Sequence, residues 1–146
     1  MKTVKEILQA KPQGLLSISP NATVLDALKM MADYEIGALV VLDGDRLSGI
    51  FSERDYARKV ILQGKASKDT AVAEIMTHKV VCVRPEQSVE ECMALMTDKR
   101  IRHLPVVEGS SIAGIVSIGD LVRSVITVQG ETIQYLQQYI TGQYQS

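Results

Sequence analysis

The stretch GIFSERD, residues 49–55, returns 65 positions later as GIVSIGD, residues 114–120. The similarity extends outward from this stretch without a gap, so that residues 15–61 align with residues 80–126. Identical residues fall at turns, at apolar positions and at one polar pair, as expected when one structural unit occurs twice in the chain.

A short lead-in precedes each copy, since residues 4–7 resemble residues 72–75. The shift is 68 there, so the first copy carries three extra residues around positions 11–14. The repeat therefore predicts the domain organisation. The expected parts are a first repeat at about 4–62, a polar linker at 63–71, a second repeat at about 72–127 and a C-terminal helix at 128–146.

Each copy predicts a strand, a helix, two strands and a second helix. Thr23 and Ser88 each precede apolar residues at helical spacing and have an acidic residue three positions later, which is the capping-box pattern. Further helices are expected after Ser52 and Ser117. The expected strands lie at residues 15–19, 38–42 and 47–51 of the first copy and at 80–84, 104–107 and 112–116 of the second.

The predicted fold class is α/β in the broad sense (α+β), with two β-α-β-β-α repeats. A single unit of about 50 residues would bury too little apolar surface to be comfortably stable alone. Two copies packed about a pseudo-two-fold axis cover each other's exposed sheet faces. We therefore expect one domain over residues 1–146.

The composition excludes several classes of function. Charge is balanced, with 16 Lys and Arg against 17 Asp and Glu, which disfavours binding to nucleic acid or to an anionic membrane. No apolar run is long enough for a membrane span or a signal peptide, so a cytoplasmic protein is expected. Two cysteines without a CxxC pattern and two histidines predict neither a disulfide framework nor a metal site.

The last residues of the chain predict one more helix. Ile133, Leu136, Tyr139 and Ile140 recur at helical spacing, which is typical of an amphipathic helix. Such a helix either closes the domain or packs on a second subunit, and we favour the second interpretation, a homodimer.

The shared frame of the two copies is Gly-apolar-x-Ser-x-x-Asp. Its structural interpretation is a capped helix N-terminus, in which Ser and Asp bond each other's backbone amides. Its functional interpretation uses the same geometry. A helix N-terminus suits phosphate, and a carboxylate accepts two hydrogen bonds from the vicinal hydroxyls of a ribose.

Both copies resemble CBS motifs, the paired modules (Bateman domains) named after cystathionine beta-synthase. The resemblance covers nearly the whole chain, from about residue 4 to 126. It is carried by the duplication, by the Gly-x-x-Ser-x-x-Asp ending of both copies, by RHLPV at residues 102–106 and by IMT at residues 75–77. It implies the CBS fold and binding of adenosyl ligands such as AMP, ADP, ATP, S-adenosylmethionine or NAD.

The resemblance also implies site residues. Asp55 and Asp120 would hold ribose hydroxyls, and Ser52 and Ser117 would contact ribose or phosphate. The other positions it places around the ligand are Ser17, Ile18, Ile36, Gly37, Ala38, Cys82, Val83, Ile101, Arg102, His103 and Pro105.

The two copies differ in charge around this frame. We expect Arg54 of the first copy and Arg102 of the second to meet phosphate, because guanidinium groups bind it in a forked geometry. The alternative is that both are solvated surface residues. His103 has no nucleophile beside it in the sequence and is expected to form part of the pocket wall rather than to act as a base.

The sequence thus favours a regulatory module that binds an adenosine nucleotide and signals to a regulated protein not identified by the sequence. The alternative is a protein-interaction or dimerisation module whose clefts stay empty. An enzyme is disfavoured, because no nucleophile–base pair and no metal motif is visible.

Overall fold

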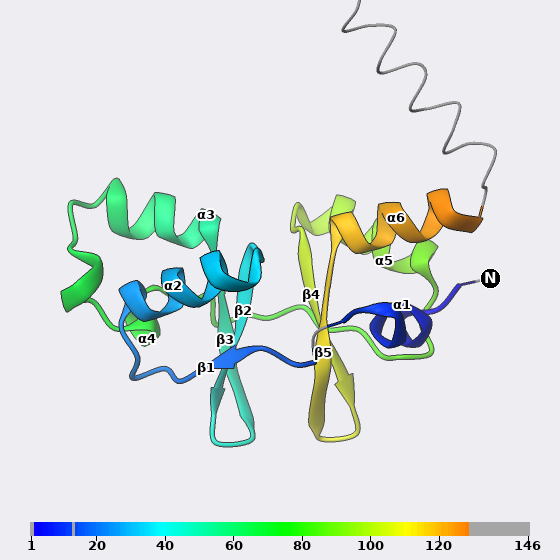
Figure 1. Cartoon of the computed structure of the whole chain (residues 1–146), viewed down its shortest axis with the longest axis horizontal. Helices are drawn as coiled ribbons and strands as arrows, with labels where there is room; N and C mark the ends of the chain where they lie inside the picture. The colour runs from blue at the N-terminus through cyan, green and yellow to red at the C-terminus, as the bar shows by residue number, and fades with distance from the viewer. Residues whose placement is uncertain (1, 13, 129–146) are drawn as a thin grey trace, which may run out of the picture.

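The computed structural model describes residues 2–12 and 14–128. Two halves lie side by side, each with a small sheet and helices packed against it (Figure 1). The fold class expected from the sequence is confirmed. The predicted terminal helix and its contact with a second subunit lie beyond residue 128, outside the described residues.

The first repeat contains a three-stranded sheet of order β1-β2-β3. β1 is parallel to β2, and β2 is antiparallel to β3. Gly44 lies in the hairpin turn at a φ of 64°, a left-handed conformation that favours glycine. The elements are β1 (Ser17–Ile18), α2 (Val24–Tyr34), β2 (Ala38–Asp43), β3 (Arg46–Ser52), α3 (Glu53–Tyr56) and the π-helix η1 (Ala57–Ile61).

The second repeat follows the same order, except that no first strand forms among its described residues and that its last helix is α-helical over its whole described length. Its elements are α5 (Val89–Lys99), β4 (His103–Glu108), β5 (Ser111–Ser117) and α6 (Ile118–Val128). The strand predicted at residues 80–84 is wrong, because only an isolated bridge between Val83 and Val106 forms there. A bridge one residue earlier would need an N–H group from Pro105, and proline has none.

The capping boxes predicted at Thr23 and Ser88 are present at α2 and α5. The Thr23 hydroxyl accepts from the amide of Asp26, and the Asp26 carboxylate accepts from the amide of Thr23. Ser88 and Glu91 make the same reciprocal pair at α5. Local sequence therefore sets where these helices begin.

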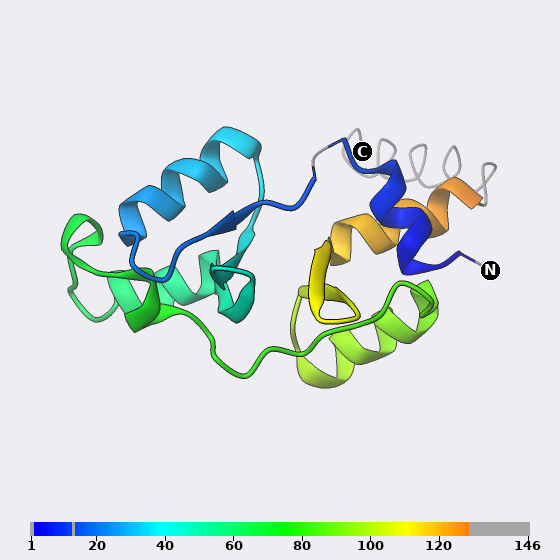
Figure 2. The same ribbon diagram turned by 90° about the horizontal axis from the view of Figure 1, so that it is seen from below.

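The lead-in segments exchange partners between the repeats. α1 (Val4–Ala10) packs in the core of the second repeat, where Val4 is fully buried. α4 (Val72–Ile75), preceded by the 3-10 helix η2 (Ser67–Asp69), packs in the core of the first. Seen from below, two connecting segments of the chain run between the halves in opposite directions (Figure 2).

Each repeat has its own apolar core. Phe51 and Leu39 are fully buried in the first, and Leu104 and Leu121 in the second. Among the described residues, no helix is both long and apolar enough to cross a bilayer.

Candidate functional site

Ser117 and Asp120 form the predicted capping box where β5 passes into α6. The amide of Ser117 donates to Oδ2 of Asp120 at 2.9 Å, and the amide of Asp120 donates to Oγ of Ser117 at 3.1 Å. Asp120 is 8% exposed. The motif therefore holds a nearly buried carboxylate at the start of a helix.

Two cations from different parts of the chain neutralise this carboxylate. Nζ of Lys11, which directly follows α1, lies 2.9 Å from Oδ2 of Asp120 and also donates to the carbonyl of Ile115 at 2.8 Å. Nη2 of Arg123 lies 2.6 Å from Oδ1. Burial opposes ionisation of Asp120, but the hydrogen bonds from Ser117 and Lys11 outweigh it and lower its pKa below the usual value.

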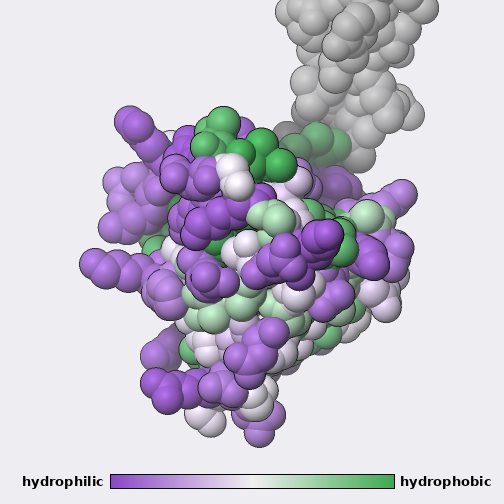
Figure 3. Space-filling view, turned by 90° about the vertical axis from the view of Figure 1, so that its left-hand side faces the viewer, coloured by the Kyte–Doolittle hydropathy of each residue, from purple (hydrophilic) through white to green (hydrophobic). Residues whose placement is uncertain are grey.

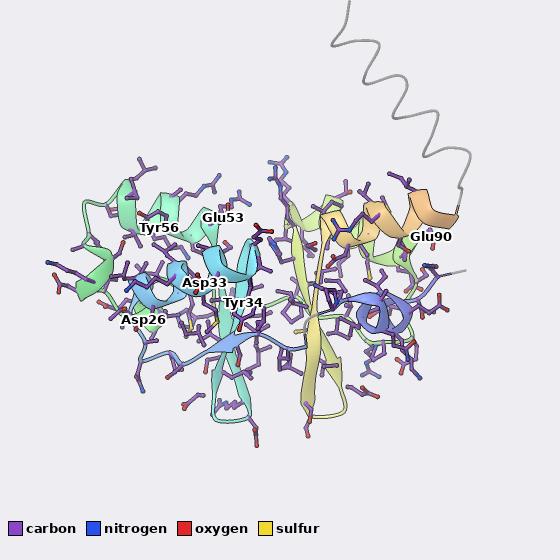
Figure 4. The ribbon with its side chains drawn as sticks, in the orientation of Figure 1. Asp26, Asp33, Tyr34, Glu53, Tyr56 and Glu90 are labelled. Carbon is purple, nitrogen blue, oxygen red and sulfur yellow. The ribbon has the colours of Figure 1, made fainter. Side chains whose placement is uncertain are left out.

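A cavity of about 570 Å³ opens beside this pair, a volume typical of small-ligand sites. The cavity lies between the two repeats, because the end of α2 and the start of β2 form one wall and the β5–α6 junction forms another. Tyr34, labelled in Figure 4, lies at the end of α2 nearest the second repeat. The lining residues are Lys2, Ile7, Ala10, Lys11, Pro12, Tyr34, Glu35, Ile36, Gly37, Ala38, His103, Ile115, Ser117, Asp120, Arg123 and Ser124.

The equivalent pair of the first repeat has different partners. The amide and hydroxyl of Ser52 both donate to Oδ2 of Asp55 at 3.0 Å. The hydroxyl of Thr77, just after α4, donates to Oδ1 at 3.0 Å, and Nζ of Lys59 lies 3.1 Å from the same atom. Asp55 is not among the residues that line the cavity. The duplicated motif thus gives two unequal environments.

His103 and Gly37 meet where the two repeats face each other. A Cβ atom on Gly37 would lie 3.3 Å from Nε2 of His103 and 3.3 Å from Oε1 of Glu53, so glycine permits this close approach. Burial lowers the pKa of His103, the charge of Asp120 raises it, and the charges of Lys11 and Arg102 lower it further. The net lowering favours a neutral imidazole in the cavity wall at pH 7.

Six of the sixteen predicted site residues line the cavity, and the other ten do not. Those in the lining are Ile36, Gly37, Ala38, His103, Ser117 and Asp120. Those outside it are Ser17, Ile18, Ser52, Arg54, Asp55, Cys82, Val83, Ile101, Arg102 and Pro105.

Several residues of the second group have other neighbours in this structure. Nη1 of Arg54 donates to the carbonyl of Arg100 at 3.0 Å, across the boundary between the repeats. The carbonyl of Arg102 accepts from the amide of Ile118 at 2.9 Å, while its side chain is exposed. Ile18 and Val83 are buried with the two cores. The ligand contacts expected of these residues remain predictions.

Sequence reasoning missed the cations that hold the two aspartates. Lys11 belongs to the three extra residues of the first lead-in, so the break in the repeat was a signal that this segment has its own role. Arg123 aligns with Arg58 as an identical pair, three residues beyond the motif aspartate. Lys59 follows Asp55 by four residues, a spacing that allows an ion pair on a helix.

Within residues 2–12 and 14–128, no group of three or more His, Cys, Asp or Glu side chains is arranged to hold a metal ion.

The CBS domain family matches the chain twice, over residues 4–61 and 72–127. A curated relative, the CBS domain-containing protein CBSX3, mitochondrial, of Arabidopsis thaliana, is 43% identical over 151 residues, which covers 97% of this chain and 73% of the relative.

Solved structures agree with this match. A protein with CBS domains from Burkholderia ambifaria is 56% identical and superposes with a TM-score of 0.83, covering 86% of this chain and 95% of that one. A CBS domain pair in complex with 5′-methylthioadenosine and S-adenosyl-L-methionine is 28% identical, with a TM-score of 0.76 and coverages of 86% and 96%.

Proposed function

This chain belongs to the CBS domain family as a tandem pair, and we propose that it is a regulatory module that binds an adenosine-containing ligand between its repeats. The proposed ligands are AMP, ATP, NAD or S-adenosylmethionine. Ligand binding would favour one arrangement of the repeats over another, and a partner protein would respond to that arrangement. We propose no catalytic role for it.

The observation that carries this proposal is the cavity of about 570 Å³ beside Asp120. It brings the Ser117 and Asp120 motif of the second repeat against residues 36–38 of the first. A carboxylate that accepts on both oxygens suits the two hydroxyls of a ribose, and the apolar wall that includes Ile36 and Ile115 suits an adenine ring.

The position of the cavity explains how binding would become a signal. Its walls come from both repeats and from the segment after α1. A ligand that contacts all three makes contacts that depend on how the repeats are placed. A tenfold preference for one placement corresponds to about 1.4 kcal/mol of coupling free energy.

Calorimetric titration of the whole chain with AMP, ATP, NAD and S-adenosylmethionine tests the proposal. At least one of them is expected to bind and to raise the melting temperature. Asp120→Asn is expected to weaken that binding because it replaces an acceptor oxygen with an amide donor. Absence of heat and of a melting shift with all four at millimolar concentration would overturn the proposal.

Asp55→Asn, compared with Asp120→Asn, tells whether the first motif also binds. Circular dichroism of both variants checks that the fold is kept. We propose ligand contact at both aspartates, so that each substitution weakens binding. Loss with Asp120→Asn alone would restrict the site to the cavity.

A second candidate function, self-association without a ligand, is favoured by exposed apolar side chains. Ile61 at the end of η1 is 55% exposed and Leu62 is 75% exposed. Figure 3 views the end of the molecule that carries the first repeat, where apolar atoms gather near the upper edge. Sedimentation of the whole chain and of Leu62→Glu tests this candidate, since the charge would dissociate a dimer formed there.

A further inference from the structure

We propose that the cavity beside Asp120 selects adenosine ligands that carry phosphate, and that Lys11 and Arg123 determine this selection. Neutral nucleosides and S-adenosylmethionine, which has a net positive charge, would bind there more weakly. This inference rests on the proposed function and deepens it by naming the class of ligand.

The charges of the cavity lining carry the argument. Three cationic side chains line it, Lys2, Lys11 and Arg123, against two anionic ones, Glu35 and Asp120. A further lining residue, His103, is neutral at pH 7 because its pKa is lowered, by burial above all. The lining therefore carries a surplus of positive charge, which favours an anionic ligand.

The arrangement around Asp120 shows how this charge becomes available. Lys11 uses two of its three ammonium donors, on Oδ2 of Asp120 and on the carbonyl of Ile115. Ribose hydroxyls that donate to the same carboxylate would replace part of this bonding. Lys11 would then have donors for a phosphate oxygen without leaving the cavity.

Arg123 extends the positive region over the start of α6. Its Nη1 atom lies 3.5 Å from the position that a Cβ on Gly119 would take. Because residue 119 has no side chain, the Arg123 guanidinium lies close to the backbone at the start of the helix. Residue 119 aligns with Arg54 of the first repeat, and the Arg54 guanidinium donates to the carbonyl of Arg100.

Among the described residues, Asp55 has one cationic partner, Lys59, whereas Asp120 has two, Lys11 and Arg123. A further donor to Oδ1 of Asp55 is the hydroxyl of Thr77, a neutral group, whereas Lys11 donates to Oδ2 of Asp120. Glu53 also adds a negative charge at the start of α3, where the second repeat has the apolar Ile118. Selection by charge is therefore assigned to the cavity beside Asp120.

Calorimetry with adenosine, AMP and S-adenosylmethionine tests the inference, at low and at high salt. AMP is expected to bind at least about tenfold more tightly than adenosine, the effect expected of one charge-assisted hydrogen bond. This advantage should shrink at high salt, while the affinity for adenosine stays the same.

Lys11→Gln and Arg123→Gln are each expected to weaken AMP binding about tenfold more than they change adenosine binding, because adenosine has no phosphate for these side chains to contact. Lys29→Gln is the matched control, because it removes the same charge from an exposed position of α2 outside the cavity. The Arg123 side chain is 73% exposed, so its variant keeps the test decisive if Lys11→Gln fails to fold.

The outcomes separate the two proposals. Equal affinities for adenosine and AMP, tighter binding of S-adenosylmethionine than of AMP, or no effect of Arg123→Gln would overturn the inference and leave the proposed function standing. Failure of all three compounds, and of ATP and NAD, to bind would overturn both.

Discussion

Replacing Lys11 by methionine is predicted to destabilise the fold by about 2 kcal/mol, although Lys11 follows a short terminal helix. A hydrogen bond between charged groups contributes roughly 1.5–3 kcal/mol, and Asp120 loses one when Lys11 is removed. The loss stays below the roughly 3–5 kcal/mol of a broken buried pair. The reason is that Arg123 still neutralises the carboxylate and that the amide of Ser117 still donates a hydrogen bond to it.

Lys59→Met is the matched control for this prediction. Lys59 makes the corresponding pair in the first repeat, with Nζ 3.1 Å from Oδ1 of Asp55 and 3.0 Å from the carbonyl of Ile75. Its side chain is 46% exposed, against 22% for Lys11. Greater exposure to water lowers the expected loss to below about 1 kcal/mol.

Urea unfolding at pH 7 measures both variants. With a slope of about 2 kcal/mol/M, Lys11→Met should lower the midpoint by about 1 M and Lys59→Met by less than half of that. A double-mutant cycle between Lys11→Met and Asp120→Asn should return a coupling of about 1–2 kcal/mol. If Lys11→Met cost no more than Lys59→Met, or if the cycle gave no coupling, the reasoning would be refuted.

Three further predictions concern packing, pH and the exchanged lead-in. Gly49→Ala should cost about 1–3 kcal/mol in urea unfolding, because its Cβ would lie 2.6 Å from the carbonyl oxygen of Thr77. Stability should fall as the pH drops below about 6.5, because the lowered pKa of His103 makes the unfolded chain bind the proton more tightly. Asp120, whose pKa is also lowered, adds a loss below about pH 4. Val4→Ala should cost about 1–3 kcal/mol and reduce amide protection in β4 and β5 more than in β2 and β3.

These predictions have direct controls. Gly14→Ala, where a Cβ meets nothing within 4 Å, should change stability by less than about 0.5 kcal/mol. In His103→Gln, the loss between pH 7 and 5.5 should be smaller than in the parent chain, and an unchanged loss would contradict the assignment. Equal loss of protection in both repeats would contradict the prediction for Val4→Ala.

Elements governed by neighbouring residues could be predicted from the sequence. The capping boxes of α2 and α5 each involve residues three positions apart, so Thr23 and Ser88 specify them without any distant contact. The strand at 80–84 could not be predicted in the same way. Whether it forms depends on the residue that faces it from β4, and that residue is Pro105.

In the candidate site, too, the residues that follow a local pattern could be predicted, and those that depend on distant contacts could not. Ser117 and Asp120 were predicted, because their spacing within one helix turn is a local pattern. Their partner Lys11 lies 109 residues from Asp120, and no local rule joins them. The phosphate contact expected of Arg54 is a further case, since its hydrogen bond to the carbonyl of Arg100 depends on how the two repeats meet.

The duplication of one structural unit, with the same helix starts and the same Ser-x-x-Asp pair in each copy, follows from the order of the residues alone. The packing of α1 in the core of the second repeat and of α4 in the core of the first is visible in the folded chain alone. The apolar residues of a short helix specify that it must be buried, but not which of two similar cores buries it. That choice places Lys11 on Asp120 and the Thr77 hydroxyl on Asp55, and so makes two similar motifs chemically different.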